Sequence, residues 1–402
     1  MKKIIFSLIF FAGAITLAAQ TNNISPQEFN NLAGLIEKSI SENFKTKNYE
    51  SVGKLLQEAI TLFSRLSTEH QETSKSFQAS NYYNLACVYS LQNKKKEALD
   101  AFEKAIKDWG YTNYSHANND SDLDNIRHEK RFIALMQDIR ELGDYLYILK
   151  QAGKYEKSDT AGLPYFKYEN ANSQPLKDVK DLFNLDSIAG QGDEISKIIN
   201  LMDWVHNTIR HDGNNYALCE VDAIDFFNYH KATGKGINCR GLAVTLNECY
   251  LSMGFKSRFI TCMPKDTNDP DCHVINSVYS ETLGKWLWMD PTFNAYVKDE
   301  SDNFLSIEEV REKLINDQPL FINEDANWNN QMQQTKEKYL DYYMAKNLYW
   351  LQCPAVSKFN VESRYHYRDE IYISLLPIGY KRNKGARNDV IVHDPEYFWQ
   401  KP

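Results

Sequence analysis

The sequence has few cysteines, and they are not arranged as in a structural zinc site. Seven cysteines are spread over 402 residues, with no CxxC pair and no cluster, which argues against the usual thiolate-rich sites. We therefore expect neither a bound metal nor a cofactor. Because seven is an odd number, at least one thiol stays free unless it pairs with another chain.

Long apolar segments and excess positive charge are also missing. After residue 19 no stretch approaches the length of a transmembrane helix. Lys and Arg together number 46 against 54 for Asp and Glu, which gives a formal net charge of -8. Such a chain has no electrostatic footprint for nucleic acid or an anionic membrane. We expect no membrane span and no nucleic-acid partner.

Residues 1–19 have the pattern of a secretory signal peptide. Lys2 and Lys3 precede an apolar run from Ile4 to Ala18, and small residues stand before Gln20. The run is shorter than a membrane span and polar sequence follows it. No cysteine near this point could take a lipid. We expect an exported protein, periplasmic or extracellular.

Residues 25–149 have the apolar spacing of helices almost throughout. One run, ASNYYNLACVYSLQNKKKEALDAFEKAIKDWG, places large and small residues at helix-packing positions, including Tyr82, Ala86, Ala98 and Phe102. It resembles one tetratricopeptide repeat, whose paired helices pack closely where Ala meets a bulky residue. YESVGKLLQEAITLFSRL is a weaker copy. The resemblance implies a helical module that could bind a protein partner or act as a spacer.

Residues 150–185 predict a linker, because they contain two prolines, several Ser and Asn residues and no helical period. A strand near Pro164–Tyr168 would end it. Residues 186–402 predict a second domain that opens with a helix in DEISKIINLMDWVHNTIRH.

From Gly254 the apolar period of the second domain changes to that of strands. KSRFITCMP, CHVINSVYS and KWLWMDPTF predict three strands, and ETLG makes a short hairpin between the last two. EIYISLLPI and DVIVHD predict a C-terminal strand extension. The fold class expected is α+β, with helices followed by an antiparallel sheet.

Cys239 begins an apolar helical run, CRGLAVTLNECYLSMG, and allows two interpretations. It lies at the edge of a stripe that includes Leu242 and Leu246, so it could be a small buried hydrophobe. Alternatively, Asn238 is an N-cap and Cys239 is the first helical residue, where the helix dipole favours a thiolate. Gly234 and Gly236 would then let the backbone approach a substrate.

A thiolate nucleophile needs a base and a group that orients the base. His273 starts one predicted strand and Asp290 ends the next. Antiparallel strands joined by a hairpin place these two ends side by side, so we expect a hydrogen bond between them. Taken singly, His273 could be a half-buried polar residue and Asp290 could only open a turn. The order and placement of all three favour a catalytic set.

The three motifs GINCRGLAVTLNECYLSMGFKSRFITC, DCHVINSVYS and KWLWMDPT together resemble the core of the transglutaminase-like superfamily, over roughly residues 190–300. The resemblance implies a papain-like arrangement, in which a helix headed by the cysteine packs on a sheet carrying the histidine and aspartate. It implies that Cys239 is the nucleophile, His273 the general base and acid, and Asp290 the orienting group. It implies a structural role for Arg258.

The resemblance leaves the oxyanion hole open. The backbone N–H of Cys239 is one donor, and His211 or Asn215 in RHDGNNY is a candidate for the second. The family often has an aromatic residue there, and either candidate could simply end a helix.

The expected activity is cleavage of peptide or amide bonds through a thioester, with water as the acceptor. Its substrate would be a peptide or protein. Protein cross-linking by amine transfer is one alternative. A non-catalytic scaffold that binds partners through the helical repeats is the other.

The loop CMPKDTNDPDC precedes His273 and carries Asp266, Asp269 and Asp271. These carboxylates could hold calcium, but the loop lacks the glycine and the distal glutamate of an EF-hand, so a solvated turn is favoured. Cys262 and Cys272 flank the loop, and a disulfide between them would suit an exported protein.

Overall fold

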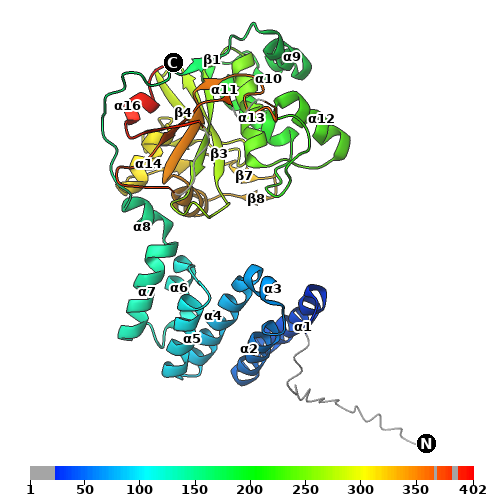
Figure 1. Cartoon of the computed structure of the whole chain (residues 1–402), viewed down its shortest axis with the longest axis vertical. Helices are drawn as coiled ribbons and strands as arrows, with labels where there is room; N and C mark the ends of the chain where they lie inside the picture. The colour runs from blue at the N-terminus through cyan, green and yellow to red at the C-terminus, as the bar shows by residue number, and fades with distance from the viewer. Residues whose placement is uncertain (1–22, 366–368, 383–387) are drawn as a thin grey trace, which may run out of the picture. The chain divides into compact units, whose positions relative to one another are not determined.

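The chain divides into two compact units. In this computed structural model, the residues described are 23–365, 369–382 and 388–402, so the predicted signal peptide lies outside them. One unit reaches to Gly143 and the other comprises Asp144–Pro402 (Figure 1).

The first unit is helical throughout, as the sequence predicts. In α4 and α5, which pack along each other, Ala86, Ala98 and Phe102 are fully buried and Tyr82 is half-buried. The resemblance to a tetratricopeptide repeat stays a prediction. The helices are α1 (Pro26–Lys45), α2 (Tyr49–Phe63), α3 (Thr68–Thr73), α4 (Lys75–Leu91), α5 (Lys95–Lys107), α6 (Tyr114–Asn119) and α7 (Lys130–Gly143), with a 3-10 turn at Ser121–Leu123.

The second unit contains a six-stranded sheet. Its order is β12-β11-β9-β2-β3-β4, and every neighbouring pair is antiparallel except β11 and β12. All five strands expected for the second domain are present in this sheet, but a sixth, β9, inserts between β2 and β11. The strands are β2 (Ser257–Met263), β3 (His273–Ser280), β4 (Lys285–Met289), β9 (Trp350–Pro354), β11 (Tyr372–Leu375) and β12 (Asp389–Val392).

Helices cover both faces of this sheet (Figure 1). Alternate strand residues face opposite ways, so Phe259 and Val274 join one core and Ile260 and Ile275 the other. The first core is closed by α9 (Gln174–Phe183), α10 (Leu185–Ala189), α11 (Glu194–Thr208), α12 (Ala223–Thr233) and α13 (Cys239–Ser252). The second is closed by α8 (Tyr145–Lys150), α14 (Ile307–Ile315), a π-helix (Glu337–Met344), α15 (Ala345–Asn347) and α16 (Pro395–Phe398).

Short strand pairs lie outside the main sheet. They are β1 (Lys167–Tyr168) with β10 (Val356–Ser357), β5 (Val297–Lys298) with β6 (Phe321–Ile322), and β7 (Asn327–Trp328) with β8 (Met332–Gln333). The strand expected near Pro164–Tyr168 is present as β1, but the predicted linker over residues 150–185 also contains the helix α9. Leu176 and Val179 of α9 are fully buried. The division of the chain falls at Gly143, so residues 144–149 also belong to the second unit.

Arg258 is the largest charged side chain buried in the second core, with no exposed surface. Its guanidinium lies 4.3 Å from the ring centre of Phe166 and 4.5 Å from that of Trp286. It donates a hydrogen bond of 2.9 Å to the carbonyl of Phe398. Cation–π contacts replace part of the lost hydration, and the hydrogen bond ties the C-terminal helix to the sheet. This agrees with the structural role expected for Arg258.

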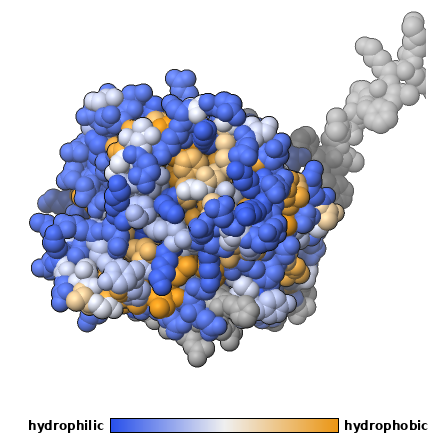
Figure 2. Space-filling view, turned by 90° about the horizontal axis from the view of Figure 1, so that it is seen from above, coloured by the Kyte–Doolittle hydropathy of each residue, from blue (hydrophilic) through white to orange (hydrophobic). Residues whose placement is uncertain are grey.

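No helix within the described ranges is long and apolar enough to cross a membrane. The face drawn in Figure 2 is mainly hydrophilic, with apolar residues confined to small patches.

We predict that Arg258→Ala lowers the free energy of unfolding of the second unit by about 3 kcal/mol, because it leaves a cavity and an unpaired carbonyl. Urea unfolding followed by tryptophan fluorescence would measure this, because every tryptophan except Trp109 lies in the second unit. The exposed Lys401 supplies the control, and Lys401→Ala should change stability by less than about 0.5 kcal/mol. Equal effects would contradict the anchoring role.

Candidate active site

Cys239 is the first residue of α13, and its side chain is half-buried. The Asn238 side chain caps the helix by accepting a hydrogen bond of 3.0 Å from the N–H of Gly241. The cap fixes the start of the helix, so the backbone N–H of Cys239 remains outside the helical hydrogen-bond ladder. The position therefore suits a thiolate, as the N-cap interpretation of the sequence predicts.

The glycine before Cys239 allows a close approach between two backbone segments. A Cβ on Gly236 would lie 2.4 Å from the carbonyl oxygen of Arg210. Ile237 forms a parallel bridge with His211, with hydrogen bonds of 3.0 Å to Arg210 and 2.7 Å from Asp212. Gly236 thus serves this pairing, and the approach to a substrate expected from the sequence stays a prediction. The pairing carries His211 to the side of Cys239.

His273 and Asp290 form a buried hydrogen bond. Nε2 of His273 lies 2.7 Å from Oδ2 of Asp290, and neither side chain has appreciable exposed surface. His273 is the first residue of β3, and Asp290 directly follows β4. The hairpin of β3 and β4 therefore brings His273 and Asp290 together, as the sequence predicts.

Asp290 accepts three further hydrogen bonds. Its Oδ1 takes the backbone N–H groups of Thr292 and Phe293 at 2.9 and 3.3 Å, and its Oδ2 takes the hydroxyl of Tyr339 at 2.6 Å. The indole of Trp288 donates to the same hydroxyl at 3.1 Å. A buried carboxylate needs such donors to remain ionised. Sequence reasoning missed Tyr339, which lies on the π-helix.

Aromatic rings enclose the imidazole of His273. The ring centre of Tyr343 is 5.1 Å away and that of Phe293 is 5.5 Å away, both in edge-type geometry. Nδ1 of His273 has no hydrogen bond of good geometry within the described chain, which leaves this nitrogen available for the thiol of Cys239. Hydrogen bonds of this kind often tighten only when substrate binds.

The electrostatics of Cys239 favour the thiolate. Burial raises the pKa of the thiol, but the polar contacts of His211 and His273 with the sulfur, together with the charge of His273, outweigh burial and bring the pKa to about 6. The pKa of His273 is also shifted. Burial lowers it, and the charge of Asp290 with the hydrogen bond to it raises it by more, so the net shift is upward. The pair is therefore stabilised as thiolate and imidazolium.

The two oxyanion candidates occupy different surroundings. His211 interacts with the thiol of Cys239, and its Nδ1 accepts a hydrogen bond of 2.9 Å from the indole of Trp328. Asn215 instead donates to the carbonyl of Gly236 and to the hydroxyl of Tyr229. The structure therefore places His211 beside Cys239, while Asn215 supports the glycine segment.

One family model matches part of this chain. Residues 183–291 match the family model described as the transglutaminase-like superfamily. The chain contains a transglutaminase-like domain. No curated protein matches. One solved structure that matches is described as "a Putative Cysteine Protease from Cytophaga hutchinsonii", with 17% identity, 35% of this chain and 46% of that chain covered, and a TM-score of 0.23. The present chain thus spans less than half of that one.

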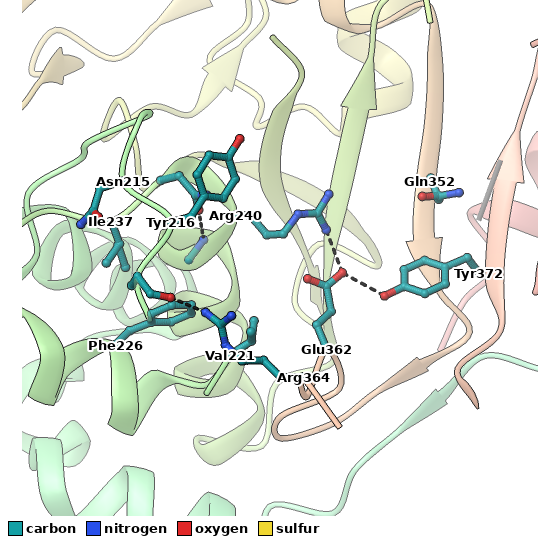
Figure 3. A pocket seen from close by; sticks show the side chains of 13 residues that line it. Asn215, Tyr216, Val221, Phe226, Ile237, Arg240, Gln352, Glu362, Arg364 and Tyr372 are labelled. Carbon is teal, nitrogen blue, oxygen red and sulfur yellow. Dashed lines mark hydrogen bonds and ion pairs between the residues drawn. The ribbon is translucent and has the colours of Figure 1, made fainter. Parts of the chain in front are cut away.

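A cavity of about 610 Å³ opens beside the start of α13. Arg240, Glu362 and Tyr372 are joined by hydrogen bonds on one side, and Ile237 and Phe226 lie on the other (Figure 3). The cavity is therefore lined by both polar and apolar side chains, a combination that suits part of a peptide.

The loops around this cavity are fixed to α13 by Glu248. Its buried carboxyl accepts the N–H of Ala223 at 2.7 Å and that of Asn360 at 2.9 Å. Burial raises the pKa of Glu248, and these two hydrogen bonds oppose that rise. Arg364 adds a further tie by donating to the carbonyls of Ala217 and Cys219.

The acidic loop before His273 is neutralised by a lysine. Lys346, itself largely buried, lies 3.0 Å from Asp269 and 2.7 Å from Asp271.

The described cysteines are all free thiols, so the proposed bond between Cys262 and Cys272 is not formed. Cys262 is buried in the sheet and pairs in register with His273.

Alkylation of Cys239 by iodoacetamide should rise with pH around a midpoint near 6, where its pKa lies. His273→Ala removes one lowering influence while burial remains, so the midpoint should move upward by about one unit or more. Mass spectrometry would follow Cys239, with buried Cys249 as the unreactive internal control. A wild-type midpoint at the ordinary thiol value of about 8.5 would contradict a lowered pKa for Cys239.

Tyr339→Phe keeps the ring but removes one donor from Asp290. We expect the free energy of unfolding to fall by about 2 kcal/mol, as for other hydrogen bonds to charge. The freed carboxylate oxygen should bind His273 more strongly and shift the alkylation midpoint to lower pH. Tyr342→Phe, on the same π-helix, is the matched control. An unchanged or higher midpoint in Tyr339→Phe would refute this account of Asp290.

Proposed function

We propose that this protein is a thiol hydrolase that cleaves peptide or amide bonds through a thioester at Cys239. One observation carries the proposal: two imidazoles lower the pKa of the half-buried thiol, and one of these, His273, is bonded to buried Asp290. A buried cysteine with only a packing role would have its pKa raised, as Cys249 does.

In the proposed reaction, the sulfur of Cys239 attacks the amide carbonyl, and the C=O electron pair moves onto the oxygen. When the tetrahedral intermediate collapses, the C–N bond breaks and the imidazolium of His273 gives its proton to the leaving amine. A water molecule then loses a proton to neutral His273 and attacks the thioester. Collapse releases the acid and restores the thiolate and imidazolium.

Two donors are proposed for the oxyanion. The backbone N–H of Cys239, free of the helical ladder, is the first. The side chain of His211 is the second, supported by its interaction with the thiol. Asn215 is not favoured because both hydrogen bonds that its amide nitrogen donates end on Gly236 and Tyr229.

Hydrolysis is favoured over amine transfer by the charges of the cavity beside α13. Glu362 supplies the one carboxylate among its described lining residues, and Arg240 and Tyr372 already bind it. A protonated amine therefore finds no free anion there, whereas water needs none. Export to the periplasm or the exterior, and binding of a protein partner by the helical unit, remain parts of the proposal that rest on the sequence.

Incubation with a peptide library and product analysis by mass spectrometry would test the reaction. We expect hydrolysed peptides, no adduct with added primary amine, and loss of activity to background in Cys239→Ala and His273→Ala. Cys219→Ser is the control and should retain activity. Amine adducts would identify a transferase, and the absence of any Cys239-dependent product would favour a binding scaffold.

A further inference from the structure

Trp328 lies on the β7–β8 hairpin, outside the residues that match the family model. Its Nε1–H points at Nδ1 of His211 over 2.9 Å, and the two rings meet at 74°. An indole nitrogen can only donate a hydrogen bond. Nδ1 of His211 must therefore accept, and the proton of the neutral ring is on Nε2.

The backbone of His211 is fixed by the same hairpin. The side chain of Asn329 accepts the N–H of His211 at 2.8 Å and donates to its carbonyl at 3.0 Å. The parallel bridge to Ile237 holds the opposite edge. Because the backbone N–H and the carbonyl of His211 are both hydrogen-bonded, the imidazole has one orientation that keeps its hydrogen bond to Trp328.

The hairpin is itself attached to the turn that follows Asp290. The ring of His206 bonds the carbonyl of Pro291 at 3.0 Å and the side-chain oxygen of Asn327 at 3.1 Å. Asn327 also accepts the N–H of Asn330 at 2.6 Å. Trp328 is therefore held in register with the catalytic aspartate.

We propose that Trp328 is a positioning residue that keeps His211 neutral, with its proton on Nε2, so that this N–H binds the oxyanion formed at Cys239. The inference rests on the proposed function and assigns the division of work between the two imidazoles. His273 transfers protons, whereas His211 keeps its proton through the whole cycle.

The alternative protonation states of His211 are opposed by the same contact. An imidazolium, or the tautomer protonated on Nδ1, would set an N–H against the N–H of Trp328. The neutral ring with Nε2–H has no free lone pair facing the thiol. His211 therefore cannot serve as a second general base, and a donor fixed before reaction needs no reorganisation when charge develops on the oxygen.

Nitrogen-15 NMR of the imidazoles tests the assignment without any substrate. His211→Gln identifies the His211 signals by their disappearance. We expect Nε2 protonated and Nδ1 unprotonated at pH 8 in the wild-type protein. In Trp328→Phe we expect a mixture of the two tautomers. A wild-type ring that is protonated on Nδ1 at this pH overturns the proposal.

Kinetics supply the second readout. His211→Ala should lower kcat about 100-fold, as for loss of an oxyanion donor, and Trp328→Phe roughly tenfold with KM little changed. In the His211→Gln background, whose amide N–H does not depend on the indole, Trp328→Phe should have no added effect. An equal effect in both backgrounds would refute the positioning role.

Two controls separate folding and function from the inference. Met332→Ala alters an exposed partner of Trp328 in the hairpin and should leave kcat within about twofold. If Trp328→Phe unfolds, benzothienylalanine at this position keeps the ring shape and removes the N–H. If the NMR result holds but no peptide is cleaved, the proposed function fails while the tautomer assignment stands.

Discussion

A carboxylate without access to water has to find its hydrogen bonds inside the protein, and Asp290 finds four. The donors come from the first residue of β3, the turn after β4 and the π-helix. An ion left with fewer partners in the interior would take up a proton or destabilise the fold. The hydrogen bonds to Asp290 therefore connect the hairpin that carries His273 to the π-helix Glu337–Met344. Because His273 lowers the pKa of Cys239, the ionisation of the thiol also depends on these bonds.

Much of this arrangement could be predicted from the sequence because its signals are local. The N-cap at Asn238, the change of apolar period at Gly254 and the short hairpin after β3 set the elements, and the hairpin sets the pairing of His273 with Asp290. The helix α9, which lies inside the predicted linker over residues 150–185, has no such clear local signal. The apolar stripe of α9 is short, and proline at the start of a helix looks like a breaker when it is read alone.

The remaining parts of the site are contacts between segments distant in sequence. Tyr339 and Trp328 have no pattern of their own, since a tyrosine on a helix and a tryptophan in a turn usually only pack. The EKYLDYYMAKN run does place Tyr339 and Tyr343 four residues apart, a spacing that could have drawn attention to one shared face. The choice between His211 and Asn215 needed the hydrogen-bond partners of each, which only tertiary structure supplies.

The strand β9 lies in the middle of the sheet, although its residues follow the family match by more than half the length of that match. A chain cut at residue 291 would keep Cys239, His273 and Asp290 but expose the edge of β2, a ready template for aggregation. The segment that matches the family model is therefore shorter than the segment that builds the sheet. Substitutions that change the site without altering the three central residues should be sought in the unmatched segment, because Trp328 and Tyr339 lie there.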